Sequence, residues 1–178
     1  MEPENLACFS QPHWKVIAQG FKPEPWFEHN HAKGTGGMLR PQHEYLRVGN
    51  RYFRFANGTA SRDAQVGGGW WLDFENFKII EQFARNSGVT LAYAARLFLA
   101  IPYDWSRVDR LVSAFLSVPL CAYSGYGQVA IASDETWTPP QHIKVRQLYI
   151  PGLYKKGQQP QLYERAFPSP VFECVANR

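Results

Sequence analysis

The chain has 178 residues, of which 45% are hydrophobic, 15% aromatic and 19% charged, and its formal net charge is +4. This length fits one domain with a core of its own, and this composition excludes disorder over most of the chain. The basic residues are scattered along the sequence, which does not favour a protein that grips nucleic acid through one charged stripe, although nucleic-acid binding stays open.

The apolar residues form no stretch long enough to span a membrane. The longest apolar run, Leu91 to Ile101, is interrupted by Arg96, whereas a spanning helix needs about 20 apolar residues. The N-terminal stretch MEPENLACFSQPH carries two acids and lacks the basic and apolar regions of a secretion signal. We therefore expect a cytoplasmic protein, with export by a machine that reads no N-terminal signal as the open alternative.

The three cysteines are too widely spaced to be typical of a disulfide framework or a zinc knuckle. Cys121 follows a proline and a leucine and stands in an apolar stretch. We predict that it is buried and inert rather than nucleophilic.

The first predicted unit is an N-terminal arm over residues 1–43. Prolines and glycines recur along it and predict irregular structure packed on the domain, with at most a short strand at Trp14 to Ala18. His29 and His31 have no third ligand at a suitable spacing, so we predict no metal site. Residues 44–178 are predicted to form one α+β core domain, with no second domain.

Two strands are predicted on either side of a loop rich in small residues. Alternation over Tyr45 to Ala56 predicts a strand with Tyr52 and Arg54 on the same side. The triplet Gly67-Gly68-Gly69 permits close approaches that a Cβ would forbid. Trp70 to Leu72 then predicts a short second strand.

A cluster of about three helices is predicted in the middle of the chain. Asp73 is suited to cap a helix that ends at Gly88, and Thr90 is suited to cap a second, very apolar helix. Apolar residues at helical spacing predict a third helix over 106–118.

Short runs rich in β-branched and aromatic residues predict further strands after the helices. They cover Leu120 to Tyr123, Gly127 to Ala132, Ile143 to Ile150 and Val171 to Val175. Strands that precede and follow a group of helices predict an α+β fold with a mostly antiparallel sheet.

The order of these elements resembles that of the ADP-ribosyltransferase fold. Tyr52-Phe53-Arg54 resembles the first-strand arginine motif of that family, and Gly69-Trp70-Trp71 lies where the family places an aromatic residue that stacks on nicotinamide. The segment Asp134 to Ile150 resembles the strand with the catalytic glutamate and the strand that follows it. The motifs that carry the resemblance are only one to three residues long.

The resemblance implies an enzyme of effector or toxin type that uses NAD as a substrate and cleaves its nicotinamide–ribose bond, as an ADP-ribosyltransferase or an NAD glycohydrolase. Glu135 would hydrogen-bond the ribose 2′-hydroxyl and stabilise the charge that develops on the ribose. Arg54 would bind the diphosphate. Trp70 or Trp71, with Tyr52 nearby, would stack on nicotinamide.

Further expectations follow from the same resemblance. Trp137 would help to enclose the cofactor, and a protein target or a neutralising partner protein is implied. Two departures concern the modified target. The Ser-Thr-Ser element of the arginine-modifying branch is missing where it is expected, because the similar Thr59-Ala60-Ser61 comes earlier, before the tryptophans. Ser133 stands two residues before Glu135, where that branch has Gln or Glu. Arginine is therefore not predicted as the modified residue.

Each assigned side chain also has a purely structural interpretation. Arg54 fits the surface of an alternating sheet. Adjacent tryptophans on a strand point to opposite faces, so at least one of Trp70 and Trp71 belongs to the core. Glu135 fits a solvated loop, and Trp137 fits either a lid or a plug.

Two other classes of function stay open. In a non-enzymatic interaction module, Trp70-Trp71 and Tyr123 to Tyr126 would form an aromatic docking face for a partner protein. In a metal-independent ribonuclease, the cluster on the late strand would serve phosphoryl transfer. That cluster consists of His142, Lys144 and Arg146.

Overall fold

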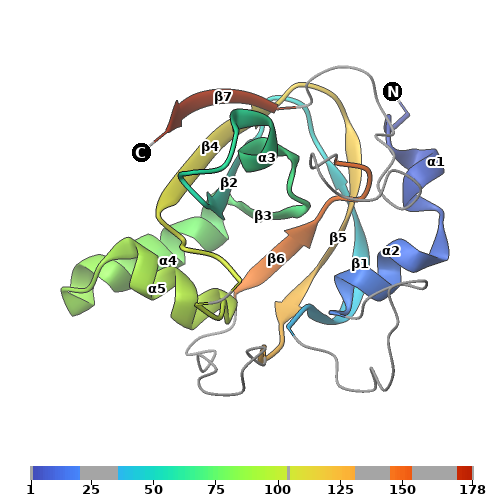
Figure 1. Ribbon diagram of the computed structural model, residues 1–178. Helices are drawn as coiled ribbons and strands as arrows, with labels where there is room; N and C mark the ends of the chain where they lie inside the picture. Colours follow the sequence, from blue (N-terminus) through green and yellow to red (C-terminus); the bar gives the residue numbers. More distant parts are fainter. Residues whose placement is uncertain (1, 21–35, 104, 131–144, 154–171, 178) are drawn as a thin grey trace.

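The computed structural model describes residues 2–20, 36–103, 105–130, 145–153 and 172–177, and it has an α+β fold (Figure 1). Its seven strands form one sheet in the order β1-β5-β6-β3-β2-β4-β7, with every neighbouring pair antiparallel. The strands are β1 (Met38–Leu46), β2 (Arg51–Ala56), β3 (Trp70–Asp73), β4 (Arg110–Leu116), β5 (Leu120–Gly127), β6 (Arg146–Tyr149) and β7 (Phe172–Asn177). The predicted fold class is therefore confirmed.

Five helices lie among the described residues, and none of them has the length and apolar character needed to cross a membrane. They are α1 (Leu6–Phe9), α2 (Pro12–Ala18), α3 (Arg62–Gly67), α4 (Phe74–Ser87) and α5 (Leu91–Leu99). Helices α4 and α5 lie side by side at one end of the molecule, and α1 and α2 lie against β1 and β5 at the other end (Figure 1).

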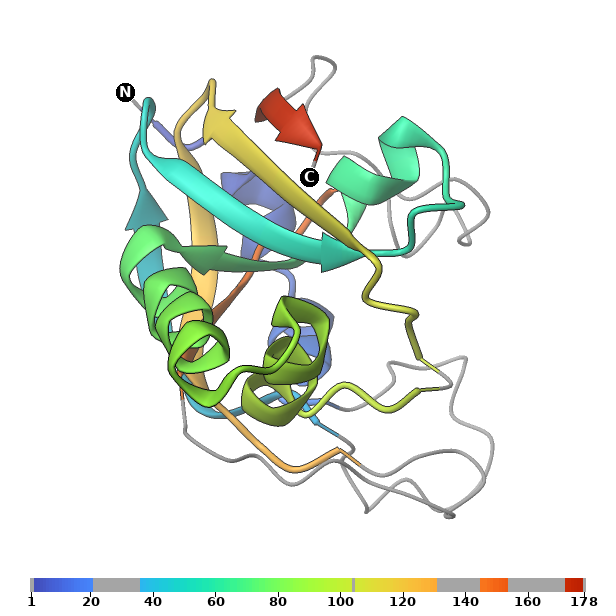
Figure 2. The same cartoon turned by 90° about the vertical axis from the view of Figure 1, so that its left-hand side faces the viewer.

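The sheet is strongly twisted, so that β2 and β4 run at a large angle to β1 and β5 in Figure 2. One face of the sheet therefore curls around a core to which both halves contribute, including Tyr52, Trp71, Val112, Leu120 and Leu148. Helix α3 packs against this core through Val66, whereas α1, α2, α4 and α5 cover the opposite face. The sheet thus has one face packed on itself and one face shared by two separate groups of helices.

Both helix groups are anchored by aromatic side chains. The ring of Phe53 on β2 stacks on Phe77 of α4, with 4.0 Å between ring centroids. Trp14 of α2 is buried and lies 6.2 Å from the ring of Tyr149 on β6. The strand residues between these two anchors, including Trp70, lie where the two helix groups leave the face of the sheet partly uncovered.

The two central helices form where capping signals predicted them. The Asp73 carboxylate accepts a hydrogen bond from the backbone N–H of Asn76 at 2.8 Å, and Thr90 Oγ1 accepts one from the N–H of Tyr93 at 3.1 Å. Gly88 ends α4 in the left-handed conformation, with φ of 64°. Local chemistry therefore determines these boundaries.

The third predicted helix, over residues 106–118, is wrong, because this segment contains strand β4. Leu111 packs toward α4 and α5, whereas Val112 and Ala114 pack into the core on the other face. A strand that is buried on both faces loses its polar and apolar alternation. Val108 also has a positive φ of 56°, which a helix does not permit.

Three other predicted elements are corrected. The segment Trp14 to Ala18, predicted as a short strand, is helical, because Pro12 occupies the first turn of α2. The predicted domain boundary after residue 43 falls inside β1. The loop before the glycine triplet contains α3, which Ser61 caps by accepting a hydrogen bond from Ala64 N–H. The strand predicted over Gly127 to Ala132 does not form over residues 128–130, which are the described residues after Gly127, because β5 ends at Gly127.

Asn5 joins the N-terminal segment to the sheet and is fully buried. Its amide donates to the carbonyls of Cys121 at 2.8 Å and Pro151 at 3.0 Å, and its Oδ1 accepts from the N–H of Cys121 at 2.7 Å. Because Asn5→Ala leaves three buried backbone groups unpaired, we expect the free energy of unfolding to fall by about 2–4 kcal/mol.

Urea unfolding measures this loss, with Ser10→Ala as the control because the Ser10 hydroxyl makes an exposed hydrogen bond, to the carbonyl of Leu6, and no other with the described part of the chain. We expect the control to change stability by less than about 0.5 kcal/mol. Equal effects of the two substitutions would contradict the anchoring role of Asn5.

Candidate functional site

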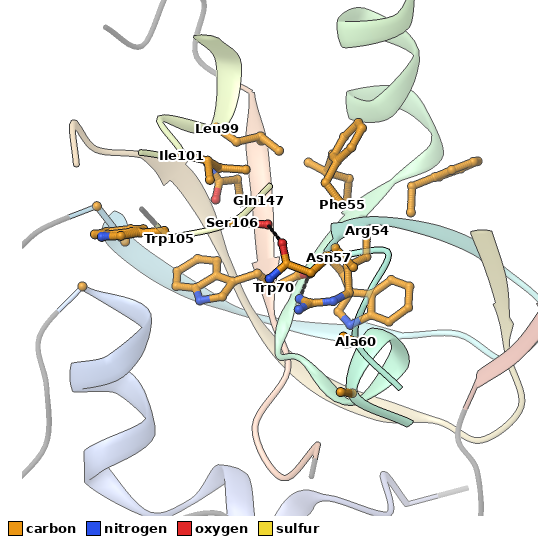
Figure 3. A pocket seen from close by; sticks show the side chains of 18 of the residues that line it. Arg54, Phe55, Asn57, Ala60, Trp70, Leu99, Ile101, Trp105, Ser106 and Gln147 are labelled. Atoms are coloured by element: carbon orange, nitrogen blue, oxygen red, sulfur yellow. Dashed lines mark hydrogen bonds between the residues drawn. The ribbon is translucent and has the colours of Figure 1, made fainter. Parts of the chain in front are cut away.

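A cavity of about 340 Å³ opens on the helix-covered face of the sheet, between the end of α5 and the end of α2. Strands β2, β3 and β6 contribute its floor, and the segment after α5 contributes Trp105 and Ser106 to its wall. Figure 3 shows these side chains around the indole of Trp70. The volume lies within the range of about 300–1,000 Å³ that is typical of small-molecule sites.

The cavity exists because β2 and β3 separate. Their ladder contains only the pairs Tyr52 with Asp73 and Phe53 with Leu72. Beyond Phe53 the side chain of Arg54 takes the place of the missing ladder: Nη1 donates to the carbonyl of Trp70 at 3.0 Å, and Nε donates to the carbonyl of Gln65 at 2.9 Å. The guanidinium thus holds the gap between the two strands in a fixed geometry.

The glycine triplet leaves room for this guanidinium. A Cβ on Gly68 would lie 2.0 Å from Arg54 Nη2, and a Cβ on Gly69 would lie 2.6 Å from the ring of Tyr149. Both distances are shorter than any real contact of a Cβ allows. The predicted close approach at the glycine triplet is therefore confirmed.

Arg54 supplies a positive charge to the cavity. Burial lowers the pKa of Arg54 from its usual range to about 10, which leaves the guanidinium charged at neutral pH. No carboxylate of the described residues pairs with it, and Nη2 makes no hydrogen bond with them. A desolvated cation without a counter-ion favours an anionic ligand.

Trp70 offers a flat apolar surface in the same cavity. Its indole packs against Tyr149, with 5.0 Å between ring centroids, and Tyr149 in turn packs near Trp14. This row of rings supports Trp70 from the side of α2. Trp105 lines the cavity as well, and a Cβ on Gly36 would lie 3.3 Å from its ring, so Trp105 lies close against that glycine.

Arg96 organises the segment that carries Trp105 and Ser106. Its buried guanidinium donates to four backbone carbonyls at 2.7 to 3.2 Å, and it lies 4.0 Å from the centroid of the Tyr103 ring. The four carbonyls belong to Ile101, Pro102, Ser106 and Arg107. The sequence signal for this role is a single arginine inside an otherwise apolar helix, and the sequence prediction did not assign it a function.

Asn57 ties the turn after β2 to the same segment. Its Oδ1 accepts from Ser106 Oγ at 3.1 Å and from the backbone N–H of Arg107 at 2.7 Å. The first of these bonds is drawn in Figure 3. Together Arg96 and Asn57 fix the wall of the cavity from both sides.

The structure brings together three of the side chains that the sequence assigned to the site. Arg54, Trp70 and Trp71 all line the cavity. Trp71 is mainly a core residue, because it is 2% exposed and its Nε1 donates to the carbonyl of Gly68. Tyr52 is 3% exposed, packs in the core with Trp71 and Val112 and does not line the cavity. Its predicted stacking role is therefore corrected.

The assigned acid and the assigned lid lie in an undescribed segment. Glu135 and Trp137 belong to residues 131–144, which are outside the described part of the chain. No aspartate or glutamate occurs among the described residues that line the cavity. The described residues of the cavity therefore supply two groups of the predicted site, the arginine cation and the tryptophan indole.

The alternative sites are changed by the structure too. Arg146 forms an ion pair with Glu44 at 3.0 Å and donates to Ser124, whereas His142 and Lys144 lie outside the described residues. In the segment Tyr123 to Tyr126, which was predicted to belong to a docking face, Tyr123 is buried and Tyr126 is exposed.

The histidines and cysteines give no metal site in the described ranges. These ranges hold no cluster of three His, Cys, Asp or Glu side chains suited to a metal, and they do not include His29 and His31. Cys121 is a free thiol, and burial raises its pKa, which confirms the prediction that it is buried.

Comparisons with known proteins give little similarity. No protein-family model matches the chain, and no curated protein matches it. Among solved structures the chain is similar to "Rhs1-CT in complex with cognate immunity protein RhsI1", with 12% sequence identity and a TM-score of 0.41 over 76% of this chain and 77% of that chain. A likeness of this degree carries no argument about function.

Proposed function

We propose that the chain binds NAD in this cavity and cleaves its nicotinamide–ribose bond, as an NAD glycohydrolase or an ADP-ribosyltransferase of effector or toxin type. The observation that carries the proposal is that the Arg54 guanidinium and the Trp70 indole line one cavity of about 340 Å³. They provide, side by side, a cation for a phosphate and a flat surface for an aromatic ring.

The roles of the side chains follow from the charges of NAD. Nη2 of Arg54 has no partner among the described residues and would donate to the diphosphate, while Nε and Nη1 stay on backbone carbonyls. Trp70, supported by Tyr149, would stack on the nicotinamide ring. The two N–H groups of Nη2 would thus hold the ligand, while Nε and Nη1 would hold the protein.

The proposed reaction breaks the bond between the ribose C1′ and the nicotinamide nitrogen. Nicotinamide leaves with the bonding electron pair, and water, or a nucleophilic group of a protein target, bonds to C1′ and loses a proton. Glu135 would stabilise the positive charge on the ribose through the 2′-hydroxyl. Enclosure of the ring by Trp137 and a protein target or neutralising partner belong to the same proposal.

Glu135→Ala is expected to lower the rate of nicotinamide release from NAD by at least about a hundredfold, because the oxocarbenium-like transition state loses its carboxylate. The measurement is chromatography of free nicotinamide over time. Glu4→Ala is the control, because Glu4 is exposed and remote from the cavity. Undiminished release by Glu135→Ala would remove Glu135 from the reaction.

A second candidate is a non-enzymatic interaction module, which one surface feature favours. Leu39 and Tyr126 are direct partners across β1 and β5, and they are 56% and 52% exposed. Exposed apolar side chains of this kind are frequent at protein interfaces. The nicotinamide assay separates the two candidates, because an interaction module has no NAD cleavage to lose on Glu135→Ala.

A further inference from the structure

Two side-chain amides line the cavity together with Trp70, namely those of Asn57 and Gln147. The Oδ1 of Asn57 is occupied by the hydroxyl of Ser106 and the backbone N–H of Arg107. These two bonds fix the amide orientation, because only the oxygen of the amide can accept them. The Nδ2 group of Asn57 is left as a donor that makes no hydrogen bond with the described residues.

Gln147 projects from β6 toward the same space. It is partly buried, and its amide makes no hydrogen bond with any residue in the described ranges. Figure 3 shows Gln147 and Arg54 on different sides of Trp70. Where water satisfies such a partly buried amide, a ligand that displaces the water has to match both its donor and its acceptor.

We infer that Asn57 and Gln147 form a subsite that recognises the carboxamide of a flat ring stacked on Trp70. The inference rests on the proposed function in that it assigns the nicotinamide end of NAD to these amides and the diphosphate end to Arg54. Asn57 and Gln147 are specificity-determining residues, because they contact the ring substituent and leave the glycosidic bond to other groups.

The chemistry of the two amides selects a carboxamide over a carboxylate. A carboxamide accepts from Asn57 Nδ2 and exchanges a donor and an acceptor with Gln147. A carboxylate has no donor, so the oxygen of Gln147 would lose its partner when water is displaced. Nicotinamide should therefore bind more tightly than nicotinate.

The test uses free nicotinamide, nicotinate and ADP-ribose, which lacks the ring. Gln147→Met keeps the length of the side chain and removes its amide, and Asn57→Asp keeps the acceptor for Ser106 and Arg107 and removes the donor. Ligand-observed NMR or calorimetry measures the affinities, and thermal unfolding confirms that each variant is folded. Gln82→Met, on the exposed surface of α4, is the control.

We expect Gln147→Met and Asn57→Asp each to weaken nicotinamide binding by about tenfold, as the loss of one or two hydrogen bonds predicts. ADP-ribose binding should change by less than about twofold. We also expect the preference for nicotinamide over nicotinate to disappear in Gln147→Met.

Other results would overturn either the carboxamide subsite or the proposed reaction. No nicotinamide binding by the unmodified chain, nicotinamide affinity unchanged in both variants, or an equal loss for nicotinamide and ADP-ribose would overturn the carboxamide subsite. If nicotinamide binding depends on Gln147 but the chain does not cleave NAD, the subsite is retained and the proposed reaction is overturned.

Discussion

Arg96→Met should lower the free energy of unfolding by about 3–5 kcal/mol, because several backbone carbonyls lose a charged hydrogen-bond donor and each buried group left without a partner costs about 1–3 kcal/mol. The guanidinium of Arg96 satisfies four backbone carbonyls of the segment after α5. Methionine keeps the apolar stem of the side chain but leaves three of these carbonyls without their donor, while the carbonyl of Pro102 keeps its hydrogen bond from the N–H of Trp105 at 3.2 Å. The segment should then move, together with Trp105 and Ser106.

Chemical unfolding and tryptophan fluorescence measure the two parts of this prediction. Arg85→Met is the matched control, because Arg85 lies on α4 with a side chain that is 68% exposed, and within the described ranges this side chain makes an ion pair with Glu81 and no other polar contact. Its expected effect on stability is below about 1 kcal/mol. An Arg96→Met protein as stable as the control, with unchanged fluorescence, would show that the segment is held by other contacts.

Gly68→Ala should have the second largest effect, because it places a Cβ where the guanidinium of Arg54 lies. The clash would be 2.0 Å to Nη2 and 2.1 Å to Cζ. The arginine must leave its carbonyl partners on Gln65 and Trp70. We expect a loss of about 2–4 kcal/mol in the free energy of unfolding, from overpacking and from lost charge-assisted hydrogen bonds.

The same substitution should weaken ADP-ribose binding by at least about tenfold, because the cation no longer lies in its fixed position. Gly58→Ala is the control, since its Cβ would meet nothing closer than the Asp109 carboxylate at 3.4 Å. Calorimetry and urea unfolding provide the two measurements. If Gly68→Ala behaves like Gly58→Ala, Arg54 does not occupy the gap between β2 and β3.

The parts of the fold that sequence predicted correctly are those that local chemistry determines. Asp73, Gly88 and Thr90 carry capping signals that act within a few residues, and α4 and α5 begin and end accordingly. The faces of β2 followed from alternation. By contrast, β4 is buried on both faces, so its apolar residues matched a helical period equally well.

The site was predictable where one residue type has few structural alternatives. Arg54 and Trp70, which the sequence placed in one predicted site, line one cavity, and the glycine triplet was recognised as a close approach. Tyr52 does not line this cavity, because this part of the sheet curls around a core, which the position of Tyr52 on β2 could not reveal. Arg96 was missed, because its partners are carbonyls that the sequence does not distinguish.

The contacts that hold the N-terminal segment and the cavity strands in place join residues far apart in the sequence, and this has a consequence for biosynthesis. Asn5 pairs with groups 116 and 146 residues further along the chain, and Gln147 reaches the cavity from β6. A ribosome releases the N-terminal segment long before these partners exist. The nascent polypeptide therefore has no assembled pocket until β6 has emerged from the ribosome, and ligand binding cannot begin before that point.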